Sequence, residues 1–178
     1  MKKILSLGLS IILFVILGQE PVYAARDTNS YDGNIFPIYA GNGSLVPPAS
    51  KLKDSLKSKR TTVLIFYLDD STTSKAFAPV VSAIKLVWGT AVELIPLTTD
   101  ELQGQPKDDP LEPAYYWHEK IPQTVIFNEE GEVVLDEEGQ VSIDSINEAI
   151  SASTGLKAPE YSIKIKSYNE YNSEASKE

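Results

Sequence analysis

The segment from Thr61 to Leu68 places the strongest constraint on the fold of this 178-residue chain. It contains the uninterrupted apolar run Val63–Leu64–Ile65–Phe66–Tyr67 and is followed directly by Asp69. A run of this length and composition is typical of a strand that is buried on both faces. Because such a strand lies inside a sheet that is covered on both sides, the chain is expected to form a layered α/β domain.

The residues after this strand predict a long helix that begins near Ser71 and ends at Gly89. Ser71 to Thr73 can cap its first turn. Pro79 lies inside the helix and is expected to kink it. The apolar positions that follow helical spacing are Phe77, Val80, Val81, Ile84, Val87 and Trp88.

The rest of the chain predicts further strands and helices, each from its apolar spacing and its flanking turn residues. The proline in the first of these segments restricts it to an edge strand or an irregular segment. In chain order, the expected elements are a first strand Asn34–Ala40, a short helix Ala49–Ser58, a buried strand Ala91–Leu97, a β-hairpin of Ile121–Phe127 with Glu132–Leu135, and a last helix capped by Ser142.

The first 24 residues predict an export signal. Lys2 and Lys3 precede an apolar run from Ile4 to Leu17, and the pattern Val22–Tyr23–Ala24 predicts cleavage after Ala24. The run is shorter than the roughly 20 residues that span a bilayer, and an uncleaved anchor is the alternative. The chain is therefore expected to act outside the cytoplasm, in a periplasm-like space or a thylakoid lumen.

Composition limits the domain organisation and the partners. About 150 residues follow the signal peptide, enough for one domain. Residues 25–60 are expected to form an N-terminal segment and first helix, 61–155 the core of the domain, and 156–178 a polar, partly disordered tail. The net charge of −9 makes nucleic acid and anionic lipid poor partners. The chain has no cysteine, so its fold cannot depend on disulfides.

The predicted order of strand, helix, strand, short helix, hairpin and helix resembles that of thioredoxins. Ser74–Val80 resembles the segment between the second active-site cysteine and the helix proline, and Ile121–Thr124 resembles the cis-proline loop. The resemblance covers Thr61 to Ser153 and implies a thioredoxin-like three-layer sandwich with a central mixed sheet. It also implies a cis peptide bond before Pro122.

The same resemblance implies that thioredoxin chemistry is missing. Ser71 and Ser74 occupy the positions of the two cysteines, and Ile65 stands where thioredoxins bury an acid. Only a thiolate attacks a disulfide, so disulfide oxidoreductase activity is excluded. What remains is a predicted binding groove with His118 nearby. Its expected residues are Asp69, Asp70, Ser71, Thr72, Thr73, Ser74, Ile121, Pro122 and Gln123.

A hydrolase-like enzyme is the alternative function. Ser71 or Ser74, His118, and Asp69 or Asp70 supply the residue types of a hydrolytic triad. However, the spacing fixes neither a base beside the nucleophile nor an acid beside the base. The serines equally suit a helix cap, and the aspartates equally suit a solvated loop near the helix N-terminus.

No metal or cofactor is expected. One histidine and no cysteine exclude the usual zinc and copper sites. The acidic runs Asp69–Asp70, Asp108–Asp109 and Asp136–Glu138 lack the alternating pattern of an EF-hand loop, so they are interpreted as solvated loops, with calcium binding as the alternative. No phosphate-binding or dinucleotide-binding fingerprint is present.

An aromatic cluster at Tyr115, Tyr116, Trp117 and His118 is a possible interface. It is predicted to form a short helix beside the cis-proline loop. Large aromatic side chains anchor protein interfaces, but they also fill the cores of small domains. Exposure of the cluster would favour binding.

Three segments give a closer resemblance. These are Tyr31–Phe36, Tyr39–Pro48 and Phe66–Ser71. They resemble cyanobacterial thioredoxin-like proteins described as thylakoid membrane photosystem I accumulation factors. The resemblance implies a photosynthetic host and a role in building or maintaining photosystem I. Together with the missing cysteines, it leads to the prediction of a redox-inactive, non-enzymatic binding protein that assists the accumulation or assembly of photosystem I. Its implied partners are photosystem I subunits or assembly intermediates, in the thylakoid lumen or at the thylakoid membrane.

Overall fold

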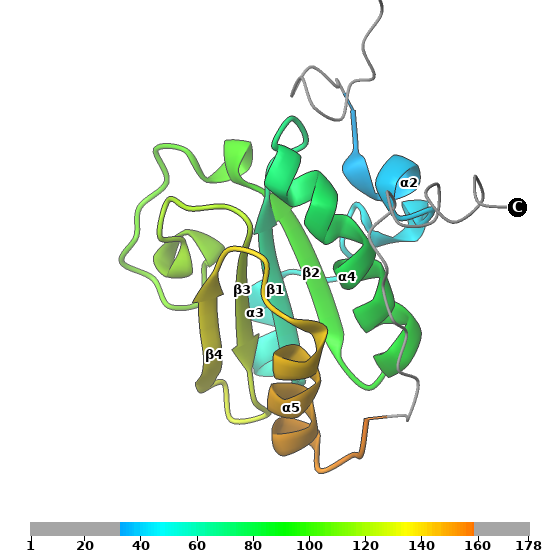
Figure 1. Cartoon of the computed structure of the whole chain (residues 1–178). Coiled ribbons are helices and arrows are strands. Elements are labelled where there is room, and N and C mark those ends of the chain that lie inside the picture. Colours follow the sequence, from blue (N-terminus) through cyan, green and yellow to red (C-terminus); the bar gives the residue numbers. More distant parts are fainter. Residues whose placement is uncertain (1–32, 159–178) are drawn as a thin grey trace, which may run out of the picture.

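A four-stranded mixed sheet forms the middle of the molecule (Figure 1). The computed structural model describes residues 33–158. The strands are β1 (Thr62–Tyr67), β2 (Glu93–Thr98), β3 (Gln123–Phe127) and β4 (Val133–Glu138), in the order β2-β1-β3-β4. β1 runs parallel to β2 and antiparallel to β3, and β3 pairs antiparallel with β4. The apolar run predicted as a central strand therefore occupies an inner position.

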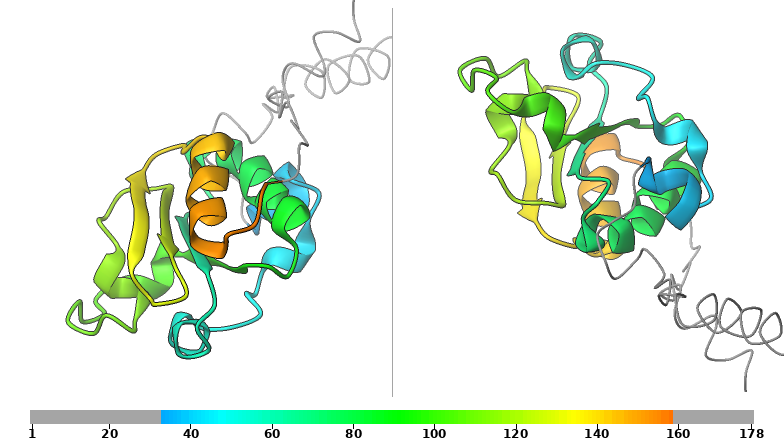
Figure 2. Two further views of the ribbon diagram at one scale, coloured as in Figure 1. Left: turned by 90° about the horizontal axis from the view of Figure 1, so that it is seen from below. Right: turned by 90° about the horizontal axis from the view of Figure 1, so that it is seen from above.

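Helices cover both faces of this sheet (Figure 2). On one face lie α4 (Thr72–Trp88) and α5 (Ile143–Thr154). On the other lie α3 (Leu52–Lys57) and two short 3₁₀ helices, η2 (Thr99–Leu102) and η3 (Pro113–Tyr116). The strand order, the strand directions and the two helical layers form the expected thioredoxin-like three-layer sandwich.

Two apolar clusters fill the layers because successive side chains of a strand point to opposite faces. Val63, Ile65 and Tyr67 of β1 join the cluster beneath α4 and α5. Leu64 and Phe66 join the cluster beneath α3 and η3. All six residues of β1 are buried, as predicted for a strand covered on both faces.

The two tryptophans of the chain lie on opposite sides of the sheet. Trp88 is buried in the α4 and α5 cluster, and its Nε1 donates to Asn147 Oδ1 at 2.8 Å. Trp117 is half-buried against the opposite cluster. Each indole ring therefore belongs to one helical layer.

Local signals set the ends of the two long helices as predicted. Ser71 caps α4 and Ser142 caps α5, each accepting from the backbone N–H three residues on. α4 ends at Gly89, whose φ of 54° lies in the region that favours glycine. Pro79 lies within α4.

The expected first strand is wrong, because Ile35–Tyr39 forms a short helix, α2. Asn34 caps it by accepting from Phe36 N at 3.0 Å. Pro37 falls in the first turn, where its missing N–H would have no helical partner. Ile35 and Phe36 are buried, and α2 packs against α4. Tertiary burial thus outweighs the β-propensity of these residues.

Two other boundaries differ from the predictions. The helix expected at Ala49–Ser58 is shorter, and it follows a short 3₁₀ helix, η1 (Gly43–Leu45), and a cis Val46–Pro47 bond. β4 extends to Glu138, so Asp136–Glu138 is part of a strand and not a loop. Backbone pairing with β3 holds these acids in the sheet while their side chains face solvent.

The predicted signal peptide, residues 25–32 and the tail from 159 onward lie outside the described residues. Within residues 33–158, none of the helices combines the length and apolar character needed to cross a membrane.

Candidate functional site

Ser71 acts as the cap of α4. Its Oγ accepts from Ser74 N at 3.3 Å and shares a hydrogen bond with Thr73 Oγ1 at 2.9 Å. These contacts satisfy one of the free N–H groups of the first helical turn. The hydroxyl therefore stabilises the helix and has no base beside it.

Ser74 is closed to substrates. It is 1% exposed, and its Oγ accepts from Leu68 N at 3.2 Å. This contact ties the start of the loop between β1 and α4 to the first turn of α4. In the position of a thioredoxin's second cysteine, the chain therefore has a structural hydroxyl.

Asp69 anchors the N-terminal segment to this loop. Its Oδ1 accepts from Ile35 N at 2.8 Å, at the first residue of α2. The pKa of the Asp69 carboxyl is raised, chiefly by burial. The hydrogen bond from Ile35 N opposes this shift, the nearby charges of Asp100 and Asp70 add to it, and that of Lys75 opposes it. The next residue, Asp70, is exposed.

Further polar groups are buried beneath α2. Asn34 Nδ2 donates to the Tyr67 hydroxyl at 3.0 Å, and the pKa of Tyr67 is raised, chiefly by burial. Lys75 is 1% exposed, with its Nζ 5.8 Å from the centre of the Tyr39 ring. Neither Asn34 nor Lys75 was predicted as part of the site, because no local pattern shows that α2 packs against Tyr67 and Lys75. Lys75 directly follows Ser74 of the predicted groove, whereas Asn34 is distant from the groove in sequence and is placed here by its bond to Tyr67.

The cis-proline loop lies against the start of α4. The Ile121–Pro122 peptide bond is cis, and Thr73 Oγ1 donates to Ile121 O at 3.5 Å. Thr73 is exposed, Ile121 is half-buried and Pro122 is buried. The structure therefore brings the predicted loops 69–74 and 121–122 together, with Asp70, Thr73 and part of Ile121 open to solvent.

Gln123 was expected near Ser71 to Ser74, but its side chain bonds to a different part of the molecule. The residue is fully buried; its Nε2 donates to Tyr116 O and Asp136 Oδ1, both at 2.8 Å. Its Oε1 accepts from His118 N at 3.0 Å. Gln123 therefore holds η3 against β4 and supports the loop from within.

His118 faces β4 and does not join a triad. Its Nε2 lies 3.4 Å from Asp136 Oδ2, and its Nδ1 lies 3.5 Å from Glu138 Oε1. Lys120 Nζ donates to Glu138 Oε2 at 2.6 Å and lowers the pKa of that carboxyl. With Ser71 and Ser74 bound within the helix cap, the structure gives no sign of the hydrolase alternative.

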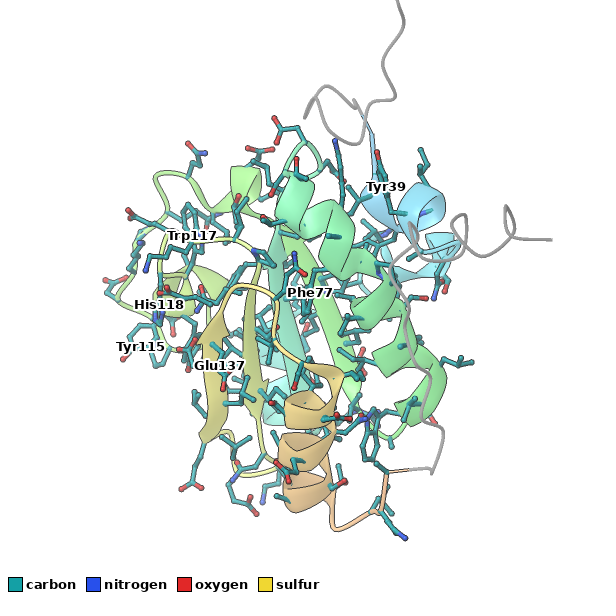
Figure 3. The ribbon with its side chains drawn as sticks, in the orientation of Figure 1. Tyr39, Phe77, Tyr115, Trp117, His118 and Glu137 are labelled. Atoms are coloured by element: carbon teal, nitrogen blue, oxygen red, sulfur yellow. The ribbon has the colours of Figure 1, made fainter. Side chains whose placement is uncertain are left out.

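The aromatic cluster divides between core and surface. Tyr116 packs edge-on against Phe127, with ring centres 4.8 Å apart, and its hydroxyl donates to Pro110 O. Trp117 is half-buried, with Lys107 Nζ 5.2 Å from its ring centre. Tyr115 is 47% exposed. Figure 3 shows Tyr115 and His118 beside β4.

The acidic residues do not gather into a metal site. Among residues 33–158, no group of three or more histidine, aspartate or glutamate side chains is arranged to hold a metal ion. Several of the carboxylates instead accept from backbone N–H groups or pair with basic side chains. Asp69 is an example of the first kind, and Glu119, paired with Lys107 at 2.9 Å, is an example of the second.

Fold and site together define a thioredoxin-like protein without the thiol pair. No family model matches the chain. It is 35% identical to thylakoid membrane protein slr1796 of Synechocystis sp. strain PCC 6803, over 96% of this chain and 90% of that protein. The chain belongs to this family of cyanobacterial thioredoxin-like thylakoid proteins.

Solved structures of thioredoxins are also similar. A mutant thioredoxin from Halobacterium salinarum shares 22% identity, with a TM-score of 0.45. The match covers 58% of this chain and 83% of the thioredoxin chain. The exposed lipoprotein thioredoxin Etrx1 of Streptococcus pneumoniae shares 16% identity, also with a TM-score of 0.45. The match covers 57% of this chain and 89% of the Etrx1 chain.

Proposed function

We propose that this protein is a non-catalytic binding module that assists the accumulation or assembly of photosystem I at the thylakoid membrane. Its relative in Synechocystis is a thylakoid membrane protein, which supports this compartment. The resemblance of residues 31–48 and 66–71 to photosystem I accumulation factors supports the assembly role. We place the domain in the lumen or on the lumenal side of the membrane, following the predicted export signal.

The observation that carries a binding role is the contrast between a closed chemical site and an open surface beside it. Ser71 and Ser74 are occupied as cap and buried anchor, so neither presents a free nucleophile. Thr73 and Ile121 nevertheless form an accessible junction of two loops. Extended peptides bind to such surfaces through backbone hydrogen bonds, without covalent chemistry.

The ligand on this surface is proposed to be a segment of a photosystem I subunit or of an assembly intermediate. An extended segment could lie across the exposed edge formed by Asp70, Thr73 and Ile121. Since no thiol is present, binding would be reversible and governed by concentration and affinity alone.

The test is a pull-down from solubilised thylakoids of the host, with a tag on the protein and quantitative detection of photosystem I subunits. The wild-type chain is expected to recover them. Thr73→Arg, which places a bulky charge at the loop junction, is expected to lose most of this recovery. Thr90→Arg, at another exposed threonine beyond the end of α4, is the matched control.

Two results would contradict the proposal at different levels. If the wild-type chain recovers no photosystem I subunit or intermediate, the assembly role is wrong. If Thr73→Arg recovers as much as Thr90→Arg, the partner binds elsewhere and the loop junction is not the binding surface.

A further inference from the structure

The two edges of the sheet differ in how well they are covered (Figure 2). In β2, Leu94, Ile95 and Pro96 are buried, and Pro96 has no N–H to offer a further strand. In β4, only Leu135 is half-buried and every other residue is exposed. Within residues 33–158, β4 pairs with β3 alone. Its outer edge is therefore open.

The composition of β4 does not protect this edge in the usual way. Natural edge strands discourage pairing with charged side chains, especially lysine, with proline or with bulges. The charges of β4 are all negative, so they repel an acidic strand but not a basic one. β4 contains neither lysine nor proline, and its one irregularity in register lies at the end near Val133. Val133 and Val134 are each 43% exposed, although valine favours strands. The edge thus keeps apolar side chains and unpaired backbone groups available.

The charges along β4 select the kind of strand that could pair with it. Asp136 and Glu138 face η3, where His118 and Lys120 lie close to them. Glu137 pairs in register with Thr124 and makes no ion pair with any residue in the described range. Figure 3 shows Glu137 on β4, below His118. The adjoining turn adds further exposed carboxylates at Glu129, Glu130 and Glu132.

We propose that the outer edge of β4 binds an extended, positively charged segment of a partner polypeptide as an added strand. Backbone N–H and C=O groups of the segment would pair with the free groups of β4. Its lysine or arginine side chains would lie about 5 Å from the acidic side chains directly opposite, close enough to form cross-strand ion pairs. Its apolar side chains would cover Val133 and Val134.

Charge also argues against a second copy of this chain as the occupant. If two β4 strands paired in parallel, the acidic residues Asp136 to Glu138 would lie opposite like charges, which is destabilising. If they paired antiparallel, each acidic residue would lie opposite Val133, Val134 or Leu135 and would gain no ion pair. The edge is therefore complementary to a basic segment and not to itself. This surface lies on β4, whereas Thr73 lies in the first turn of α4, so its test is independent of the photosystem I proposal.

The probe is a synthetic peptide of three consecutive lysines flanked on each side by two valines, acetylated and amidated at its ends, so that its lysines can lie opposite Asp136 to Glu138. Its affinity for the full chain is measured by calorimetry, and hydrogen exchange locates the contact. We expect binding, with slower exchange of β4 amides. A peptide of the same sequence with every second backbone amide N-methylated cannot complete the strand pairing, and we expect it to bind much more weakly.

Charge-reversal variants test the proposed orientation. Glu137→Lys is expected to weaken peptide binding by about fivefold or more, since an attractive pair becomes repulsive. Glu101→Lys, which makes the same charge change on η2, next to the opposite edge, is the control and should retain nearly the wild-type affinity. Thr73→Arg should also leave peptide binding unchanged.

Several outcomes would overturn the inference. Equal binding of the N-methylated peptide would show general charge attraction and not strand addition. If Glu101→Lys and Glu137→Lys weakened peptide binding equally, the attraction would also be a general effect of charge and not strand addition at β4. Protection of the outward-facing β4 amides, those not bonded to β3, in the chain without peptide would show that another segment or a second copy already covers the edge.

Discussion

The junction of α2 with α4 and the surface formed by η3 and β4 use polar residues in opposite ways. At the junction, Asn34, Asp69 and Ser74 are buried or half-buried, and each makes hydrogen bonds to defined groups. At the surface, Lys120 and Glu138 form an ion pair open to solvent. Buried polar bonds specify a single arrangement, whereas exposed ion pairs contribute little to stability. The first region is therefore suited to hold the fold, and the second is free to exchange partners.

Phe36→Ala tests whether the junction belongs to the cooperative fold and should have the largest effect. Phe36 is fully buried and packs edge-on against Tyr67, with ring centres 5.0 Å apart. Its truncation is expected to reduce the free energy of unfolding by about 3–5 kcal/mol, measured by urea denaturation. Ile38→Ala, on the exposed side of the same helix, should change it by less than about 0.5 kcal/mol. Equal effects would contradict the docking of α2.

Gln123→Leu tests how firmly η3 is held against β4. The change leaves Tyr116 O and His118 N without their buried partner. We expect a loss of about 1–3 kcal/mol in unfolding free energy and faster hydrogen exchange at His118. Gln105→Leu removes an exposed glutamine and is the control, expected within about 0.5 kcal/mol of wild type. An unchanged exchange rate at His118 would argue against the bracing role of Gln123.

Ser71→Ala tests the cap of α4 and should cost about 1 kcal/mol in thermal or urea unfolding. Ser71→Asp keeps an oxygen acceptor for Ser74 N and places a negative charge at the helix N-terminus. It should retain nearly all of the stability. If Ser71→Asp is as damaging as Ser71→Ala, the hydroxyl has a role other than capping.

Asp69→Asn tests the electrostatics of the junction through its pH dependence. The raised pKa of the Asp69 carboxyl means that the folded state holds this proton more tightly than the unfolded state. Its contribution to stability is therefore full below the ordinary aspartate pKa and is lost as the pH rises through the folded-state value. The amide oxygen of the variant would still accept from Ile35 N, but the amide cannot titrate. Between about pH 3 and pH 7, wild type should lose stability relative to the variant. The opposite slope would contradict the prediction.

Val134→Thr should have the smallest effect because the side chain is already partly in solvent. The substitution keeps a β-branched shape, so the unfolding free energy should change by less than about 0.5 kcal/mol. A loss above about 1.5 kcal/mol would show that the edge of β4 is covered, and the contrast between the two regions would fail.

The parts of the fold that the sequence predicts well are those with strong local signals. β1 has a continuous apolar run, and α4 and α5 have helical spacing with serine caps, so periodicity and capping suffice. α2 was missed because its aromatic and β-branched residues favour a strand, and only packing against α4 decides otherwise. The extension of β4 through Asp136 to Glu138 was missed for a similar reason, since pairing with β3 overrides the low β-propensity of acids.

The order of strands and helices was enough to predict which loops meet at the candidate site. It was not enough to predict the direction in which individual side chains point. The start of α4 and the loop at Pro122 meet because the strand order brings them together. The directions of the Gln123 and His118 side chains depend on their contacts with η3 and β4, which the order of the loops does not determine. The burial of Lys75 follows from the docking of α2, which no local pattern encodes.

The separation of the two tryptophans by the sheet gives the molecule a built-in pair of optical reporters. Trp88 senses the side of α4 and α5, while Trp117 senses the side of η3 and lies beside Lys107. Replacing either with phenylalanine would leave a chain whose emission reports a single layer. The fluorescence of Trp117 would then follow events near η3 and β4, while that of Trp88 follows the packing of α4 against α5. The side on which a ligand binds could therefore be assigned from the shift in emission wavelength.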